Sequence, residues 1–127
     1  MSKTKKQEIQ INVDSSYIAS SSEPAAARYV FAYSISIKNN SDSVAQLLSR
    51  HWLITDANGK TQEVHGEGVV GEQPHIQPGE SYQYTSGAVI ETSVGAMKGS
   101  YDMLGADGET FTATIPNFSL STPRTLH

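Results

Sequence analysis

The sequence predicts an all-β fold, an antiparallel two-sheet sandwich of the immunoglobulin or fibronectin III type with about seven to eight strands. Three observations support this prediction. Short segments of alternating apolar and polar residues recur along the chain, which is the period of a strand with one buried face. Turn-forming residues separate these segments at regular spacing. No segment has the 3.6-residue period of an amphipathic helix, so a sandwich is favoured, with a closed barrel as the alternative.

Composition limits the kinds of protein that this chain can be. Its 127 residues are predicted to form one domain, residues 1–127. The absence of cysteine excludes disulfides, thiol catalysis and thiolate metal sites. The net charge of −4 argues against a nucleic-acid partner, because phosphate binding requires a basic face. No apolar segment resembles a membrane span or a signal peptide, so we expect no membrane association and a cytoplasmic location.

The first predicted strand lies at residues 9–14, where isoleucine and valine alternate with polar residues. Serine, glutamate and proline at residues 20–24 indicate a loop. Residues 28–40 show the clearest strand pattern, because aromatic and β-branched side chains occupy every second position. This length and composition predict a central strand.

The next predicted strand, residues 44–56, places Leu48, Trp52 and Ile54 on one face. It ends in an Asp-Ala-Asn-Gly turn, after which residues 60–64 return as a short strand.

The second half of the chain repeats this alternation after a long loop. Strands are predicted at residues 80–87, 97–103 and 110–115, the last two joined by a turn that ends in Asp-Gly. Residues 88–95 are irregular, and residues 117–120 form a short edge segment after a proline. We expect the core to contain Phe31, Tyr33, Ile35, Trp52, Ile54, Phe111 and Ile115.

The loop at residues 65–79 is the longest segment without a strand or helix pattern. It holds four of the ten glycines and two of the five prolines. The glycines are expected to permit positive φ angles, while Val69 and Val70 hold the loop to the core. Loops on rigid scaffolds often bind other molecules, and we expect an unknown protein partner here. The predicted binding segment is Gly66, Glu67, Gly68, Val69, Val70, Gly71, Glu72, Gln73 and Pro74.

The same loop has the glycine spacing of a dinucleotide-binding motif, Gly66-x-Gly68-x-x-Gly71, so weak nucleotide or pyrophosphate binding is the alternative. Such motifs open a helix whose amide groups face the phosphates, but two prolines follow here and no helical period does. Residues 61–97 contain no Lys or Arg, and their glutamates would repel phosphate. The sequence therefore favours protein binding over phosphate binding.

Four side chains of the loop could hold a divalent metal ion: His65, Glu67, Glu72 and His75. Their spacing matches no standard ligand set, and ordering a flexible loop costs about 1 kcal/mol or more per residue. We therefore predict no cofactor and no tight metal site. His65 and His75 are weak candidates, whose binding would disappear below about pH 6. His51 is expected to make a structural hydrogen bond.

No set of residues in the sequence predicts a reaction. The serines lie in turns and on polar strand faces, and no nucleophile elbow is present. Asp102 and Asp107 flank a predicted hairpin, where aspartate is typical of turns. We therefore expect a non-enzymatic protein.

Several long motifs, in order along the chain, resemble the ApaG family. The most specific are HGEGVVGEQP at 65–74, IQPGE at 76–80 and YQYTSG at 82–87. Further matches are YVFAY at 29–33, HWLITD at 51–56, MKGSYDM at 97–103 and IPNFSL at 115–120. The resemblance extends over nearly the whole chain from about residue 9 onward.

The resemblance to this family implies a small bacterial protein with an immunoglobulin-like or fibronectin III-like sandwich. It also implies an association with cobalt resistance, magnesium efflux and the diadenosine tetraphosphate hydrolase operon. Similar domains look like interaction modules in eukaryotic F-box proteins and in a polymerase-delta-interacting protein, and pyrophosphate binding has been proposed for the family's glycine motif. A chain without a membrane span could not itself transport ions, so any effect on metal levels would be indirect.

Overall fold

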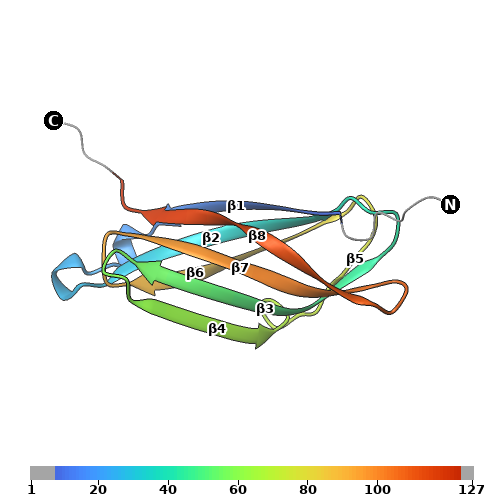
Figure 1. Ribbon diagram of the computed structural model, residues 1–127. Helices are drawn as coiled ribbons and strands as arrows, with labels where there is room; N and C mark the ends of the chain where they lie inside the picture. Colours follow the sequence, from blue (N-terminus) through green and yellow to red (C-terminus); the bar gives the residue numbers. More distant parts are fainter. Residues whose placement is uncertain (1–7, 124–127) are drawn as a thin grey trace.

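Within residues 8–123, eight β-strands form two packed antiparallel sheets, which confirms the predicted sandwich (Figure 1). The computed structural model describes residues 8–123. The strands are β1 Ile9–Tyr17, β2 Tyr29–Asn39, β3 Ala45–Asp56, β4 Thr61–Glu67, β5 His75–Ile76, β6 Ser81–Ile90, β7 Val94–Gly105 and β8 Thr110–Ser121. Two 3₁₀ turns, η1 Ala19–Ser21 and η2 Pro24–Ala26, connect β1 to β2. Within residues 8–123, no helix is long and apolar enough to cross a membrane.

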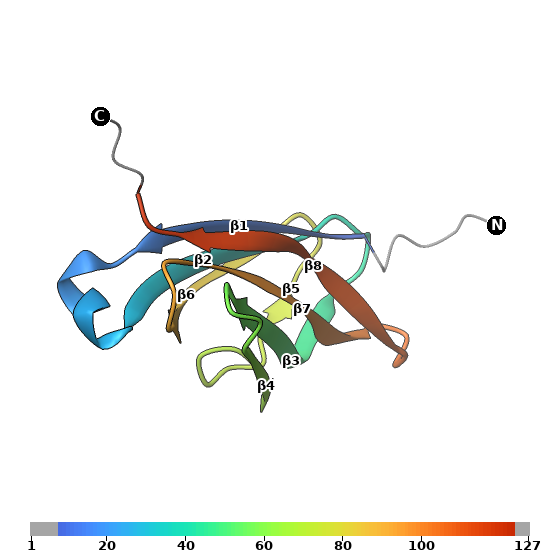
Figure 2. The ribbon, with the colours of Figure 1, turned by 60° about the vertical axis from the view of Figure 1, so that its left-hand side comes forward.

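The two sheets have the strand order of an immunoglobulin or fibronectin III-like sandwich. The smaller sheet has the order β1-β2-β6, and the larger has β4-β3-β7-β8 with β5 also paired to β3. The edge strands β1 and β8 run side by side (Figure 2), where the Ser15 hydroxyl donates to the Ser119 carbonyl at 3.1 Å. At the opposite edge, the Gln62 side chain donates to the Val89 carbonyl at 2.9 Å. Side-chain contacts thus join the sheets along both edges.

The core lies between the sheets and follows from the strand alternation. Strand β2 buries Phe31, Tyr33, Ile35 and Ile37 on one face, as the 28–40 pattern predicted. Trp52 on β3 faces them across the sandwich, with its ring 5.3 Å from that of Tyr33 in an edge-to-face contact. Of the predicted core residues, Phe31, Tyr33, Ile35, Trp52, Ile54 and Ile115 are buried.

Strand β3 differs from its predicted alternation because it contains a bulge. The pairing of β3 with β7 shifts register between Leu47 and Ser49. One extra residue reverses the parity of the strand on one side of the bulge. Leu47 is therefore fully buried, while Leu48, predicted to share a face with Trp52, is only half-buried.

Strand β8 corrects two further predictions. Phe111 is only partly buried, because it is the second residue of an edge strand, next to the hairpin turn. Residues 117–120 are a continuation of the same strand and not a separate edge segment. The chain passes through Pro116 because the pairing with β7 shifts register between Met97 and Gly99, opposite the proline, and bulges on edge strands tolerate proline.

Two loops are shorter than the sequence predicted. The predicted irregular segment 88–95 reduces to residues 91–93, since β6 continues to Ile90 and β7 begins at Val94. The predicted loop 65–79 loses His65, Gly66 and Glu67 to β4, and His75–Ile76 to β5. In both places, residues outside the alternating apolar pattern join a strand because their backbone groups pair with a neighbouring strand.

A buried pair of tyrosines makes the stability of the sandwich sensitive to alkaline pH. The Tyr84 and Tyr101 hydroxyls share a hydrogen bond in the core. Burial raises the pKa of Tyr84 to about 12 and also raises the pKa of Tyr101. An unfolded tyrosine has a pKa of about 10, so above that pH the unfolded chain releases protons that the folded chain retains. Stability therefore falls as the pH rises from about 10 to 12.

We expect a double Tyr84→Phe, Tyr101→Phe variant to lose less stability over this pH interval than the wild type. Removing both hydroxyls together leaves neither one unpaired, so its stability at pH 7 should change little. Urea unfolding measured between pH 9 and 12 checks this expectation. Equal pH dependence in the two proteins would contradict it.

Candidate functional site

A two-residue hairpin turn forms the tip of the loop that follows β4. The Val69 amide donates to the Glu72 carbonyl at 2.8 Å, and the Glu72 amide donates to the Val69 carbonyl at 2.9 Å. The central residues Val70 and Gly71 have φ angles of 48° and 81°. Two positive φ angles in a two-residue hairpin are typical of a type I′ turn. The predicted loop is therefore a tight, hydrogen-bonded structure.

Each glycine of the Gly66-x-Gly68-x-x-Gly71 motif has a structural role in this hairpin. A Cβ atom at Gly66 would lie 2.7 Å from the Arg50 guanidinium group, which packs over it. A Cβ atom at Gly68 would lie 2.1 Å from the Glu72 carbonyl oxygen, and its φ angle is 64°. Gly71 requires glycine only for its positive φ. Packing against the Arg50 side chain at Gly66 and backbone geometry at Gly68 and Gly71 thus account for the spacing without a bound phosphate.

The loop is anchored to β3 and to the core. Val69 is fully buried. The Gly68 amide and the Gln73 side chain both donate to the Leu48 carbonyl, each at 2.8 Å, and the Leu47 amide donates to the Pro74 carbonyl at 3.0 Å. These contacts hold both sides of the hairpin in place.

Val70 was predicted to hold the loop to the core with Val69, and this prediction is wrong. Val70 is 65% exposed, whereas Val69 is fully buried. The reason is the tight turn, because only Val69 lies at the inward-facing end of the hairpin while Val70 occupies its tip. The loop therefore presents an apolar side chain to solvent at its tip.

Arg50 on β3 supplies a positive charge beside the motif, although residues 61–97 contain none. Its Nη1 donates to the Gly68 carbonyl at 2.8 Å and to the Glu67 carbonyl at 3.2 Å. That nitrogen is therefore directed at the loop backbone. No α-helix begins after the motif, and none is present anywhere within residues 8–123. The arrangement lacks the helix N-terminus on which phosphate-binding glycine loops depend.

The remaining residues of the predicted segment lie around the turn. Glu67 and Glu72 are exposed. The Tyr82 hydroxyl donates to the Glu72 carboxylate at 2.8 Å, and this bond raises the pKa of Tyr82. Pro74 leads into β5, where exposed His75 pairs with Gln46 of β3. Carboxylates thus lie on both sides of the apolar tip.

The loop side chains that could hold a metal ion, His65, Glu67, Glu72 and His75, do not form a group of three or more ligands within residues 8–123. Among residues 8–123, the group of three or more metal-binding side chains that come close together is His51, Glu63 and His65. All their ligand atoms lie within 4.8 Å of one another. From the sequence, His51 is expected to make a structural hydrogen bond, and Glu63 is not among the candidate ligands. A hairpin turn centred near residue 58 would have placed residue 51 opposite residue 65.

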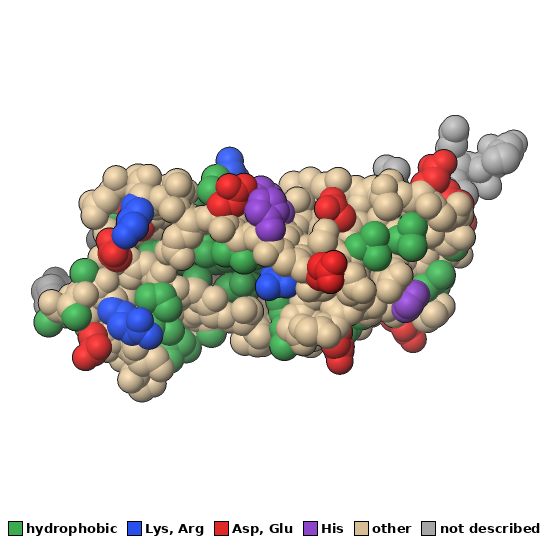
Figure 3. All heavy atoms as spheres, turned by 90° about the horizontal axis from the view of Figure 1, so that it is seen from below, with side chains coloured by type: hydrophobic (Ala, Val, Ile, Leu, Met, Phe, Trp, Pro, Cys, Tyr) green, Lys and Arg blue, Asp and Glu red, His purple; other side chains and the backbone are tan. Residues whose placement is uncertain are grey.

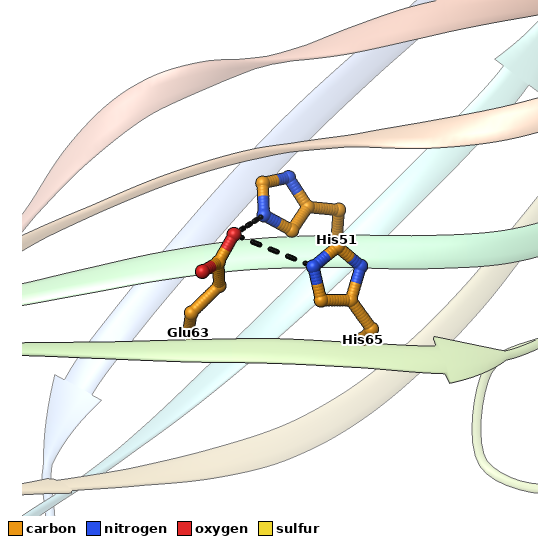
Figure 4. Close-up of side chains that lie close together, drawn as sticks. All are labelled: His51, Glu63 and His65. Atoms are coloured by element: carbon orange, nitrogen blue, oxygen red, sulfur yellow. Dashed lines mark hydrogen bonds and ion pairs between the residues drawn. The ribbon is translucent and has the colours of Figure 1, made fainter.

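The three side chains of this group share one carboxylate oxygen (Figure 4). The Nε2 atoms of His51 and His65 lie 2.7 Å and 3.3 Å from Glu63 Oε2. The hydrogen bond with His51, followed by the one with His65, lowers the pKa of Glu63. The imidazole rings stack with their centroids 4.3 Å apart. The three side chains lie on the outer face of the β3–β4 hairpin, not in the core.

A shallow hollow of about 510 Å³ lies beside this group and extends to the start of the loop. Arg50, His51, His65, Gly66 and Glu67 are among the residues that line it. Figure 3 shows histidine side chains next to acidic ones on a largely polar face. The candidate site thus has two neighbouring parts, the apolar loop tip and the His-Glu-His group.

The fold and the site define a small β-sandwich protein of the immunoglobulin or fibronectin III type, with one glycine-turn loop anchored beside an exposed histidine pair. The family model described as the ApaG domain matches residues 19–105. The chain belongs to the ApaG family, as its motifs indicated.

Relatives of known name and structure agree with this assignment. The chain is 54% identical to Protein ApaG of Thiobacillus denitrificans and 53% identical to Protein ApaG of an Azoarcus species, in both cases over 100% of each chain. It is also similar to the crystal structure of the putative ApaA protein from Bordetella pertussis, with 42% identity and a TM-score of 0.92. That match covers 97% of this chain and 100% of the other.

Proposed function

We propose that this protein is a non-enzymatic interaction module that binds a protein partner through the loop 66–74. The observation that supports the proposal is Val70, which is 65% exposed at a φ angle of 48°. A β-branched residue in the left-handed region costs about 1–3 kcal/mol. Val70 also exposes apolar surface to water, so it is unfavourable for the free protein on two counts. A partner that buries Val70 would recover the second cost.

The anchoring of the loop favours binding. The hydrogen bonds from Gly68 and Gln73 to the Leu48 carbonyl, with Val69 buried beneath, hold the tip in one conformation. A preformed loop loses little conformational entropy when it binds. The loop is therefore suited to insert Val70 into a pocket of a partner.

The charges beside the tip indicate the chemistry of the partner. Exposed Glu67 and Glu72 lie close to Val70 along the hairpin. Complementary charge at the rim of an interface increases specificity and association rate. We expect an apolar pocket with Lys or Arg at its rim. Any effect of this protein on cobalt resistance or magnesium efflux, with which its family is associated, would then be exerted through this partner.

Nucleotide or pyrophosphate binding by the same glycines is the weaker alternative. Besides the glycine spacing, the observation in its favour is the Arg50 guanidinium group beside Gly66. The Arg50 Nη1 atom donates to two loop carbonyls, and exposed glutamates flank the turn. A phosphate would have to displace these bonds and overcome that repulsion.

A Val70→Asn variant tests the proposed function. Asparagine tolerates positive φ, so the loop should keep its conformation and the free energy of unfolding should rise by about 1 kcal/mol. We expect this more stable variant to lose the partner that the wild type captures from bacterial lysate. Denaturant melts and affinity capture followed by mass spectrometry measure the two effects.

Val94→Asn is the matched control, because Val94 is also an exposed valine, 45% exposed, but lies at the start of β7. It should capture the same partner as the wild type. If Val70→Asn and the wild type capture the same proteins, the loop tip is not the binding surface.

A further inference from the structure

The β3–β4 hairpin holds three metal-ligating side chains on one face. His51 and His65 are directly opposite each other in the strand pairing. Glu63 precedes His65 by two residues, and alternate residues of a strand share a face. Figure 4 shows the two imidazoles and the carboxylate pointing toward one another. The backbone pairing, and not a flexible loop, brings these groups together.

From this geometry we propose that His51, Glu63 and His65 bind a divalent first-row transition metal ion. Their ligand atoms lie within 4.8 Å of one another, and both Nε2 atoms face the same Glu63 oxygen. Ligands about 2.0–2.2 Å from a tetrahedral ion are about 3.4 Å apart. The present separations of the ligand atoms are close to this value. Small side-chain rotations are therefore enough to place an ion between the three groups.

Binding a metal ion at His51, Glu63 and His65 would cost less conformational entropy than binding one in the loop. His65, Glu67, Glu72 and His75 would need a loop to rearrange around the ion. The Cα positions of His51, Glu63 and His65 are fixed by paired strands, so binding orders only side-chain rotations. The existing hydrogen bonds of Glu63 to both imidazoles already restrict those rotations.

The ligand set defines the class of ion. Two imidazole nitrogens and one carboxylate oxygen suit zinc, copper(II), nickel or cobalt(II), whereas magnesium prefers oxygen ligands and retains its water. The side chains of His51, Glu63 and His65 are 39%, 58% and 70% exposed. Water or a group from another molecule thus completes the coordination. The adjoining hollow contains Glu67 and Asp102 as well as Arg50, so it does not repel a cation.

Calorimetric titration of the full chain, free of any histidine tag, with zinc at pH 7.5 tests the site. We expect one ion per chain, and binding at least tenfold weaker in His51→Gln, His65→Gln and Glu63→Gln. His75→Gln is the matched control, since His75 is an exposed strand histidine outside the group. It should bind zinc as the wild type does. Magnesium should produce no saturable heat.

Two-dimensional NMR of the histidine side chains provides a second measurement on the same samples. Zinc should shift the ring signals of His51 and His65 together and leave those of His75 unchanged. Absence of stoichiometric binding, or binding that survives both His51→Gln and His65→Gln, would overturn the proposal. So would equal loss of binding in His75→Gln. The proposal does not depend on the loop, and the Val70→Asn variant should bind zinc normally.

Discussion

Replacing Phe31 with alanine is expected to lower the free energy of unfolding by about 3–5 kcal/mol. Phe31 lies on β2, the central strand of the smaller sheet, and has no exposed surface. Its ring packs against Tyr17 at 5.4 Å between centroids. Two paired strands hold β2 on both sides, so the core cannot easily close around the missing ring. Urea unfolding at pH 7 measures the loss.

Phe111→Ala is the matched control for this prediction. The same side chain is removed, but Phe111 is only partly buried near the hairpin turn of edge strand β8. We expect a loss of about 1–2 kcal/mol, in keeping with partial burial of a phenylalanine. Equal losses in the two variants would mean that Phe111 belongs to the core, as the alternation of β8 alone had predicted.

Strand alternation predicted the sandwich because most of its strands have one wet face and one dry face. In β2 the aromatic residues and isoleucines keep the same parity from Tyr29 to Ile37, and all those from Phe31 onward are buried. Alternation does not predict burial correctly in β3, where the parity changes at a bulge. The bulge between Leu47 and Ser49 depends on how β3 pairs with β7, and this pairing joins residues far apart in the sequence. A local pattern therefore could not reveal that Leu47 is buried instead of Leu48.

The candidate site was only partly predictable for a related reason. Glycine spacing correctly indicated a turn, because positive φ at Gly68 and Gly71 is a local property. The packing of Arg50 over Gly66 and the grouping of His51 with His65 are contacts between strands. Only a prediction of the β3–β4 register could have found them. The positive φ of Val70 could not be predicted from its residue type, since β-branched residues rarely adopt this conformation.

The second large effect is expected for Gly68→Ala, which should destabilise the protein by about 3 kcal/mol. A methyl group at Gly68 adds the cost of a left-handed conformation, about 1–2 kcal/mol. It would also lie 2.1 Å from the Glu72 carbonyl oxygen, a backbone atom that can move only if the hairpin opens. Opening exposes Val69, and full burial of a valine contributes about 1.5–3 kcal/mol.

A Gly71→Ala variant separates the cost of the left-handed conformation from the cost of the close contact with the Glu72 carbonyl. Gly71 also has a positive φ, 81°, but an added Cβ would meet no atom within 4 Å. It should therefore cost only about 1–2 kcal/mol and leave Val69 buried. Denaturant melts give the two energies, and NMR shifts of the Val69 methyl groups report whether the hairpin has opened. If Gly68→Ala costs no more than Gly71→Ala, the close packing against Glu72 does not hold the loop. The fixed position of Val70, on which the proposed partner binding depends, would then rest on the hydrogen bonds to the Leu48 carbonyl and on the burial of Val69.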